Sequence, residues 1–313
     1  MSRDPILVVS ELSKSFGAIR AVDAVSFEVE RGEILGIAGP NGSGKSALFN
    51  AITRVPFSPS QGVVLFDGAP IHRLPANKIA KRGVARTIQR ESVFAELSAI
   101  DNALVTIEQT KRARRLDQKV ALAERAPEIV GFPATLHKWK AGTLPVSLRK
   151  LVMIASALAL DPLVLLLDEP ASSLTVEEIE RMRLLIVALQ RRGTTILLVE
   201  HLLSLLMAVW DRLLVLDQRR MIAMGPLADV VKDLVVIETY LGPPHDRAAV
   251  GTALTLGRVR ADRGVQRDRS AAGAGRIHRV FPPQRAWQIH AEENEQRCAV
   301  ALGSVEIQDS QLA

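Results

Sequence analysis

The residues best suited to chemistry stand near the start of the chain, where the motif Gly39-x-x-x-x-Gly44-Lys45-Ser46 follows an apolar run and precedes a segment with helical spacing. The motif fits a phosphate-binding loop. Its glycines, with Gly42 between them, let several backbone N–H groups converge on phosphate oxygens, and the following helix points its positive end at the same atoms. Lys45 supplies a positive charge and Ser46 a hydroxyl for Mg²⁺. A chance strand–turn–helix with an exposed lysine is the alternative, which so long a match between strand and helix disfavours.

Two acidic residues follow the most apolar run of the chain, residues 163–167. Such an unbroken apolar run is typical of a strand that is buried on both faces in a parallel sheet. Asp168 and Glu169 come directly after it, at the carboxyl end, where ligands bind in doubly wound sheets. Asp168 therefore fits an acid that holds Mg²⁺ beside a phosphate loop, and Glu169 fits a general base for an attacking water. For both, a turn or helix-capping carboxylate is the alternative.

A histidine follows a second buried strand. Residues 195–199 form an apolar run that ends at Glu200-His201. A lone histidine is usually a packing or surface residue, but this one stands at the same predicted sheet edge as the two acids. His201 is therefore a candidate contact for the γ-phosphate of a bound triphosphate.

The elements around these motifs predict an α/β fold. Residues 12–17 are expected to form a turn that carries one aromatic residue, Phe16. No segment between residues 92 and 160 has the sequence pattern of a strand, so this stretch is expected to be a helical subdomain inserted into the α/β domain. The expected strands are 6–9, 25–30, 34–38, 62–66, 84–89, 163–167 and 195–199, with a hairpin of 212–217 and 220–224. The expected helices are 75–82, 98–107, 117–126 and 175–190.

The composition narrows the classes of function. The chain has 313 residues, of which 48% are hydrophobic, so it can bury a large core. Aromatic residues make up only 4%, which argues against base stacking, and no nucleic-acid partner is expected despite a formal net charge of +6. Cys298 is the one cysteine, so no internal disulfide is expected. The N-terminus lacks the apolar core of a signal peptide, and the sequence predicts no membrane span.

Taken in order along the chain, these motifs resemble those of ATP-binding cassette (ABC) ATPases over about residues 5–242. The resemblance implies a P-loop NTPase (RecA-like) core with an N-terminal antiparallel β subdomain and an inserted α-helical subdomain at about residues 92–160. It also implies ATP and Mg²⁺ as cofactors, with Glu169 as the catalytic base and His201 as the sensor of the γ-phosphate.

The same resemblance assigns the remaining site residues. Phe16 would stack on adenine, and Gln89 would contact Mg²⁺ and couple the site to a membrane partner. The residues that would contact ATP are Phe16, Gly39, Asn41, Gly42, Ser43, Gly44, Lys45, Ser46, Ala47 and Gln89. The residues that would hold Mg²⁺ are Ser46, Gln89 and Asp168.

Three further segments resemble the ATPase subunits of branched-chain amino acid uptake systems: residues 84–89, Val93-Phe94 and residues 236–242. Importers of amides or urea look similar. The resemblance implies an ATP-hydrolysing subunit that energises a membrane importer. Its partners would be membrane permease subunits and a second ABC ATPase subunit, and it would lie peripherally on the cytoplasmic face of the inner membrane.

One segment departs from the family pattern. Where the family has a Leu-Ser-Gly-Gly-Gln-like signature that reaches the partner's ATP across a dimer, this chain has residues 144–150. Pro145 offers neither a hydroxyl nor an N–H, and Leu148 replaces an amide. Residues 171–175 also lack the usual Asp of the dimer contact. The chain's own loop and acids look intact, so a heterodimer with one active site is favoured over a homodimer with two weak sites.

Three other functions are compatible with parts of the sequence. A regulatory module that binds nucleotide with little hydrolysis would fit the altered signature. A DNA-maintenance ATPase of the same superfamily is disfavoured because the span between Gln89 and Leu144 is too short for a coiled-coil insertion. A GTP-binding switch is disfavoured because Asn77-Lys78 is followed by Ile79-Ala80 and not by a guanine-binding Asp.

The composition changes after Gly242. Residues 243–313 contain ten Arg and no Lys, and they show no sustained periodicity. Disorder is the expectation for this tail, and a contact with nucleic acid or lipid headgroups is the alternative.

Overall fold

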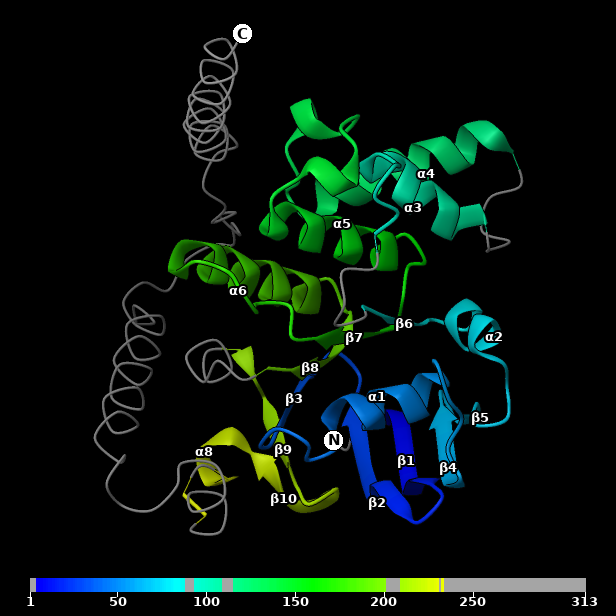
Figure 1. Cartoon of the computed structure of the whole chain (residues 1–313), viewed down its shortest axis with the longest axis vertical. Coiled ribbons are helices and arrows are strands. Elements are labelled where there is room, and N and C mark those ends of the chain that lie inside the picture. The colour runs from blue at the N-terminus through cyan, green and yellow to red at the C-terminus, as the bar shows by residue number, and fades with distance from the viewer. Residues whose placement is uncertain (1–3, 88–92, 109–114, 201–208, 231, 234–313) are drawn as a thin grey trace, which may run out of the picture. The chain divides into compact units, whose positions relative to one another are not determined.

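The computed structural model describes residues 4–87, 93–108, 115–200, 209–230 and 232–233 (Figure 1). Gln89, His201 and the predicted tail, residues 243–313, lie outside these ranges. Among the described residues, no helix combines the length and the apolarity that crossing a bilayer requires.

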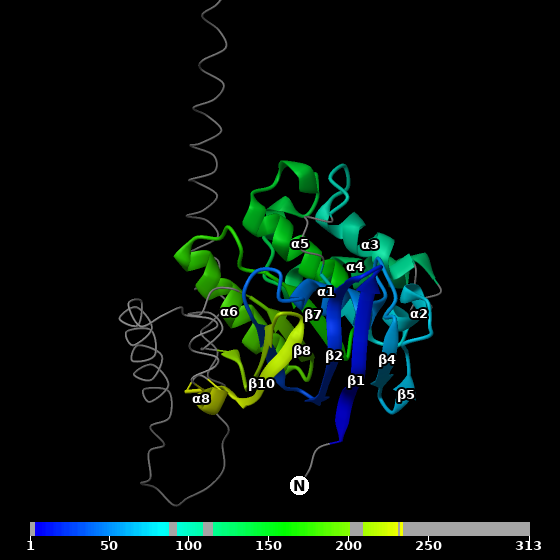
Figure 2. The same ribbon diagram turned by 60° about the horizontal axis from the view of Figure 1, so that its bottom comes forward.

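The N-terminal half contains a four-stranded antiparallel sheet with the order β2-β1-β4-β5. In β2, Val25, Phe27 and Val29 are buried and alternate with more exposed residues, as the sequence predicts. Figure 2 shows β1 lying between β2 and β4. The bounds are β1 Pro5–Phe16, β2 Ile19–Glu30, β4 Gln61–Phe66 and β5 Ala69–Pro70.

The turn expected at residues 12–17 is wrong, because β1 continues to Phe16. Leu12 is fully buried and pairs with Val25, and Lys14 pairs with Val22. The register shifts between Val9 and Leu12, where Glu11 has a φ of 49°. A bulge of this kind breaks the alternation of side chains, so the pattern of the sequence does not show the second half of the strand.

The second sheet has six strands in the order β10-β9-β3-β8-β7-β6. Every pairing in it is parallel except that of β10 with β9. All five residues of β3, β7 and β8 are buried, which explains their unbroken apolar sequences. The bounds are β3 Ile34–Ala38, β6 Val84–Arg86, β7 Val164–Asp168, β8 Thr195–Val199, β9 Arg212–Asp217 and β10 Arg220–Pro226.

Two hydrophobic clusters cover the two faces of this sheet. Leu165 and Leu167 of β7 belong to a cluster with the later helices, whereas Val164 and Leu166 belong to a cluster with α1 and the antiparallel sheet. The helix α1 therefore lies between the two sheets, where Figure 1 shows it. Thr175 caps α6, where Thr175 and Glu178 form a reciprocal capping box. The helices are α1 Lys45–Thr53, α2 Ala76–Lys81, α3 Ala99–Glu108, α4 Leu116–Ile129, α5 Val146–Leu158, α6 Val176–Arg191 and α8 Leu227–Val230.

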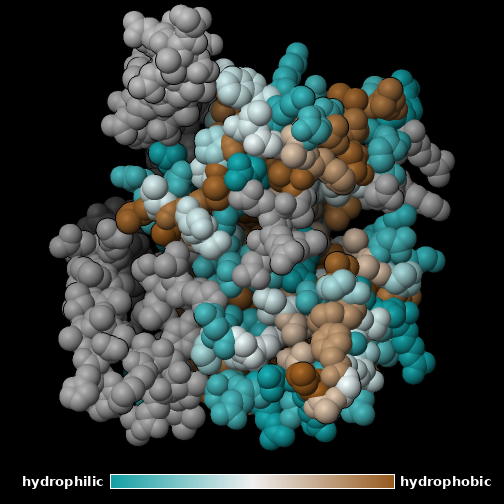
Figure 3. All heavy atoms as spheres, in the orientation of Figure 1, coloured by the Kyte–Doolittle hydropathy of each residue, from teal (hydrophilic) through white to brown (hydrophobic). Residues whose placement is uncertain are grey.

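The helices α3, α4 and α5 follow β6 and precede β7 in the sequence, and they pack on one another. Figure 1 shows them grouped on one side of the six-stranded sheet. Their predicted positions, 98–107 and 117–126 for the first two, agree with the observed bounds to within a few residues. Figure 3 shows hydrophobic surface over this part of the molecule. Phe94, Leu116 and Trp139 are large apolar side chains of this segment that are exposed. The helical insertion therefore presents part of its apolar surface to the outside.

A close contact in the sheet gives a stability prediction. A Cβ atom on Gly36 of β3 would lie 2.0 Å from a ring atom of Trp210. Gly36→Ala should therefore lower the free energy of unfolding by about 3 kcal/mol, because neither the ring nor the strand can move without disturbing the core. Urea unfolding measures this change.

Gly225→Ala is the matched control, since a Cβ there would meet Val230 at an ordinary 3.5 Å. That variant should stay within about 0.5 kcal/mol of the wild type. Equal unfolding midpoints for the two variants would show that the close contact with Trp210 does not constrain the fold.

Candidate functional site

The loop between β3 and α1 is shaped by glycines that leave no room for side chains. Gly39 has a φ of 150°, and a Cβ on it would lie 2.2 Å from the carbonyl oxygen of Leu216. Gly44 caps α1 with a φ of 103°, and a Cβ on it would lie 2.7 Å from the carbonyl oxygen of Ala21. The chain can therefore bend tightly here and bring its N–H groups to the start of α1, the arrangement that binds phosphate.

The side chain of Lys45 is held across this loop. Its Nζ donates hydrogen bonds to the carbonyl oxygens of Gly39, at 2.7 Å, and Pro40, at 2.9 Å. Burial lowers the pKa of Lys45, while the nearby carboxylates of Glu169 and Asp168 act in the opposite direction. The ammonium group thus lies inside the loop and within electrostatic reach of both predicted acids.

The register of the parallel strands brings Asp168 to the loop. Asp168 of β7 and Ile37 of β3 both pair with Val199, which lies between them on β8. Asp168 therefore lies at the same level of the sheet as the end of β3, just before Gly39. The two motifs are more than a hundred residues apart in the sequence and meet at one edge of the sheet.

Asp168 forms a buried ion pair with Arg86 at the end of β6. The distance from Arg86 Nη2 to Asp168 Oδ2 is 2.8 Å, and the two side chains are 7% and 0% exposed. Arg86 also donates to the side-chain oxygen of Asn50 at 2.5 Å and lies over the ring of Phe49. Burial raises the pKa of Asp168 above its ordinary value, and Arg86 acts in the opposite direction.

The second carboxylate oxygen of Asp168 is suited to bind a metal ion. Asp168 Oδ1 is buried and makes no hydrogen bond within the described part of the chain. The Ser46 hydroxyl is close enough to Asp168 to help lower the pKa of that carboxyl. One carboxylate and one hydroxyl, completed by phosphate oxygens and water, form a donor set that suits Mg²⁺. No cluster of three or more His, Cys, Asp or Glu residues that could hold a metal alone occurs among the described residues.

Glu169 follows Asp168 in a left-handed conformation, with a φ of 50°. Its N–H donates to the carbonyl oxygen of Val199, and its own carbonyl oxygen accepts from Lys150 Nζ at 3.0 Å. Lys150 also donates to Ser172 Oγ at 2.8 Å. Backbone strain in a residue held by its surroundings is frequent at functional sites. The chain after β7 is therefore fixed on both sides, by β8 and by α5.

Phe16 ends β1 and is 48% exposed. Its ring makes an edge-to-face contact with Phe57 at 4.9 Å between centroids, and Lys14 Nζ lies 4.7 Å from the Phe16 centroid. The ring is therefore held by its neighbours and remains about half exposed, which is compatible with the predicted adenine platform.

The other predicted contacts are placed as follows. Asn41 and Gly42 are exposed in the loop, Ser43 is buried there, and Ala47 is half-buried in the first turn of α1. Gln89 and His201 belong to the residues that the structure does not describe, so their predicted roles stay predictions.

The altered signature, residues 144–150, lies at the start of α5. Pro145 is the N-cap residue, with a φ of −54°, and it is exposed. Proline fits this position because the first N–H groups of a helix need no partner inside it. The segment thus keeps the shape of a helix start while losing one backbone donor.

Sequence reasoning missed Arg86, Lys150 and Glu200. Arg86 was read only as part of a strand, yet it is the partner of Asp168. Glu200 is buried, and its Oε1 accepts a hydrogen bond from the N–H of Ala171. No local pattern marks these residues, because each partner lies on a different segment. A charged residue directly at the end of an apolar strand, as in Glu200, is the one available signal.

A phosphate loop, a buried acid and a second carboxylate at the carboxyl edge of a parallel sheet define a P-loop nucleotide hydrolase. The family model described as ABC transporter matches residues 22–172. The high-affinity branched-chain amino acid transport ATP-binding protein BraF of Pseudomonas aeruginosa is 34% identical over 256 residues, which cover 77% of this chain and 99% of BraF. The chain belongs to the ABC family of transporter ATPases.

Two further comparisons agree with this family assignment. The ribose import ATP-binding protein RbsA 2 of Rhizobium meliloti is 35% identical over 242 residues, which cover 75% of this chain and 46% of that protein. The ADP conformation of MJ1267, an ATP-binding cassette of an ABC transporter, matches with a TM-score of 0.69 and 29% identity over 76% of this chain and 99% of that one. The predicted fold class and family are confirmed, and ATP hydrolysis coupled to transport follows from the family. The alternative of a regulatory module gains no support.

The Arg86–Asp168 pair gives a prediction with a definite pH dependence. Arg86→Met leaves a buried carboxylate without its partner and should lower the free energy of unfolding by about 3 kcal/mol near pH 7. A folded-state pKa raised above the unfolded value means that stability falls as pH rises through the interval between them. Removing Arg86 raises the pKa of Asp168 further, so the loss should be larger at pH 8 than at pH 5. Urea unfolding at both pH values measures it.

Arg183→Met is the control, because Arg183 pairs with Glu180 on the surface of α6. It should change stability by less than about 1 kcal/mol at either pH. A loss in Arg86→Met that is the same at pH 5 and pH 8 would contradict the role of the ion pair.

Proposed function

We propose that this chain binds ATP with Mg²⁺ and hydrolyses it to drive an importer of branched-chain amino acids or related amides. The observation that carries the proposal is the meeting of Lys45, Ser46, Asp168 and Glu169 at one sheet edge. Lys45 contacts the loop carbonyls at hydrogen-bond distance and lies near both carboxylates. Cation, hydroxyl, metal acid and base are the parts that phosphoryl transfer to water needs.

Each residue has a separate task in this proposal. The loop N–H groups and Lys45 hold the β- and γ-phosphates, and Phe16 stacks on adenine. When bound, Mg²⁺ neutralises phosphate charge, and Ser46, Asp168 and Gln89 are the residues that hold it. Glu169 takes the proton from the attacking water, while His201 contacts the γ-phosphate. Most of the rate would come from positioning and charge neutralisation.

The solute and the partners are inferred from the relatives. The branched-chain amino acid protein BraF matches almost over its full length, which supports that class of solute. A ribose import protein is equally similar in sequence but matches over only 46% of its length. Membrane permease subunits would be the partners that hold the chain peripherally at the cytoplasmic face of the membrane. The exposed Phe94, Leu116 and Trp139 offer apolar surface for such a contact.

We also propose that residues 5–242 form the ATPase domain, with the helical subdomain at about 92–160. The share of the chain that matches BraF, 77%, supports this extent. A second ABC ATPase subunit of different sequence is the favoured dimer partner, because Pro145 and Leu148 leave this chain a poor signature to offer.

Replacing the proposed base tests the mechanism. Glu169→Gln should lower ATP hydrolysis by about a hundredfold or more, while ATP binding stays close to that of the wild type, because only the proton acceptor is lost. Phosphate release and nucleotide binding are measured on the chain with its partner ATPase.

Lys45→Ala is the contrasting variant. It should lose nucleotide binding itself, because the charge that faces the phosphates is gone. Hydrolysis by Glu169→Gln at the rate of the wild type would refute the assignment of the base.

Mutating the base in each subunit of a mixed dimer tests the preference for a heterodimer. The Glu169→Gln change in this chain should remove most of the activity, since its intact site is completed by the partner's signature. The corresponding change in the partner should cost less than about twofold, because that site relies on Pro145 and Leu148. Phosphate release by the purified pair is the measurement, and equal losses would disprove the asymmetry.

A further inference from the structure

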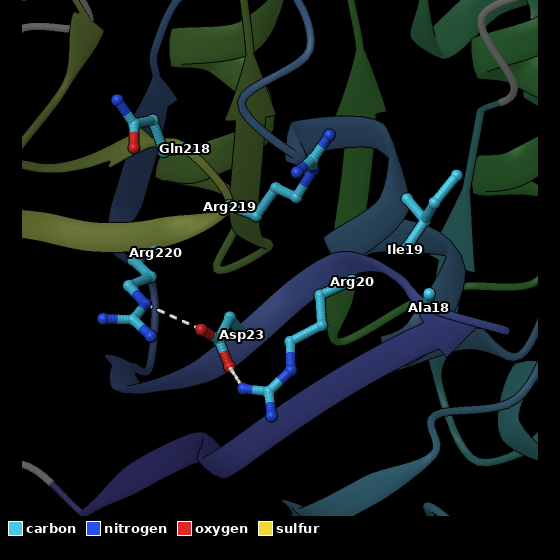
Figure 4. Close-up of a pocket in the computed structure, with 7 residues that line it drawn as sticks. All are labelled: Ala18, Ile19, Arg20, Asp23, Gln218, Arg219 and Arg220. Atoms are coloured by element: carbon cyan, nitrogen blue, oxygen red, sulfur yellow. Dashed lines mark hydrogen bonds and ion pairs between the residues drawn. The ribbon is translucent and has the colours of Figure 1, made fainter.

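A pocket of about 580 Å³ lies beside the phosphate loop, on the side of β3 away from Asp168. One wall is the turn between β1 and β2 with the start of β2, and the other is the turn between β9 and β10. Figure 4 shows the residues that line it, which are Ala18, Ile19, Arg20, Asp23, Gln218, Arg219 and Arg220.

Both walls touch the phosphate loop at Gly44. A Cβ on Gly44 would lie 2.7 Å from the carbonyl oxygen of Ala21 and 3.6 Å from the Cα of Arg219. The walls are joined to each other where the N–H of Asp23 donates to the carbonyl oxygen of Arg219 at 2.9 Å. Because β9 is parallel to β3, the turn after β9 stands at the same edge of the sheet as the loop after β3.

Only one of the three arginines has a free guanidinium within the described part of the chain. Asp23 forms ion pairs with Arg20 and with Arg220, the latter at 2.6 Å, so both are engaged. The Arg219 side chain makes no hydrogen bond or ion pair with any described residue. In Figure 4 it points away from Asp23, towards the loop that leads into α1.

The backbone at this turn favours glycine, yet it carries an arginine. Gln218 and Arg219 have φ values of 42° and 73°. A two-residue hairpin turn with both residues left-handed is best filled by Asn-Gly. A residue with a Cβ costs about 1 kcal/mol more than glycine there. The Arg219 side chain makes no contact with described residues that would offset this cost, which makes it a candidate for contact with a ligand.

We propose that Arg219 binds the α-phosphate of the nucleotide. The inference rests on the proposed ATP site. Phe16, the adenine platform, lies two residues before Ala18 on one wall of the pocket, and Gly44 of the phosphate loop touches both walls. With adenine on Phe16 and the outer phosphates in the loop, the part of ATP that joins them would pass between these points. An arginine fork matches a phosphate there better than it matches the ribose hydroxyls.

Two glycine variants of the full-length chain separate the side chain from the backbone. Arg219→Gly removes the guanidinium and relaxes the turn, whereas Gln218→Gly relaxes the same turn and leaves the guanidinium in place. Dissociation constants for ATP, ADP and inorganic pyrophosphate are measured by titration calorimetry. Arg219→Gly should bind ATP and ADP about tenfold more weakly, the effect of one partly exposed charge-assisted contact. Gln218→Gly should bind them as the wild type does.

Pyrophosphate identifies the phosphate that is contacted. It fills the β and γ positions but has no α-phosphate, so Arg219→Gly should bind it as tightly as the wild type. Equal weakening for pyrophosphate would place the contact at the outer phosphates and overturn the proposal. Equal losses in both glycine variants would also overturn it, since the turn and not the guanidinium would then matter.

The ATP site and the Arg219 contact can fail separately. Wild-type binding of ATP by Arg219→Gly, with loss of binding in Lys45→Ala, would refute the Arg219 contact and leave the ATP site intact. Absence of ATP binding in the wild type would refute both. A folded state is confirmed by thermal melting, in which Arg219→Gly should be at least as stable as the wild type.

Discussion

The parallel pairing of β3, β8 and β7 is the constraint on which the rest of the site depends. Parallel strands end at the same edge, so residues that follow each of them meet in space however far apart they stand in the chain. The register is set by burial, because each strand sends alternate residues into two separate cores. A slip of one residue would send each side chain into the opposite core, where the neighbours differ, and would move Asp168 away from the loop. The position of Asp168 beside the loop is therefore a consequence of core packing.

A buried acid in such a core needs a cation, and Arg86 supplies it. Arg86 binds one oxygen of Asp168, while the other oxygen makes no hydrogen bond within the described part of the chain. An unpaired buried carboxylate would take up a proton and lose its value as a metal ligand. Arg86 thus favours the ionised form before any metal is bound, and its contacts with Asn50 and Phe49 tie it to α1. The proposed metal ligand Asp168 and the helix that follows the loop are connected through one side chain.

Much of this could be predicted from sequence, for physical reasons that also explain the misses. The runs at 34–38, 163–167 and 195–199 are strands buried on both faces. A short, unbroken apolar sequence is typical of such a strand, so these three could be predicted. The loop and its acids stand out because their residue types are dictated by phosphate chemistry. The second half of β1 was missed because a bulge at Glu11 breaks its alternation. Arg86 was missed because its partner is 82 residues away, and pairing over that distance leaves no local trace.

Some of the strained backbone positions stand where the chain leaves the sheet at its carboxyl edge. Glu169 and Ser173 after β7, and Gln218 and Arg219 after β9, all have positive φ values without being glycine. Each costs about 1 kcal/mol, which the fully buried strands beside them can offset. A side chain in such a position is aimed by a backbone that cannot relax, because β-strand pairing fixes it on one side. If Glu169 is the base and Arg219 binds phosphate, as proposed above, their left-handed positions have a physical reason: the direction of each side chain is fixed at a small loss of stability.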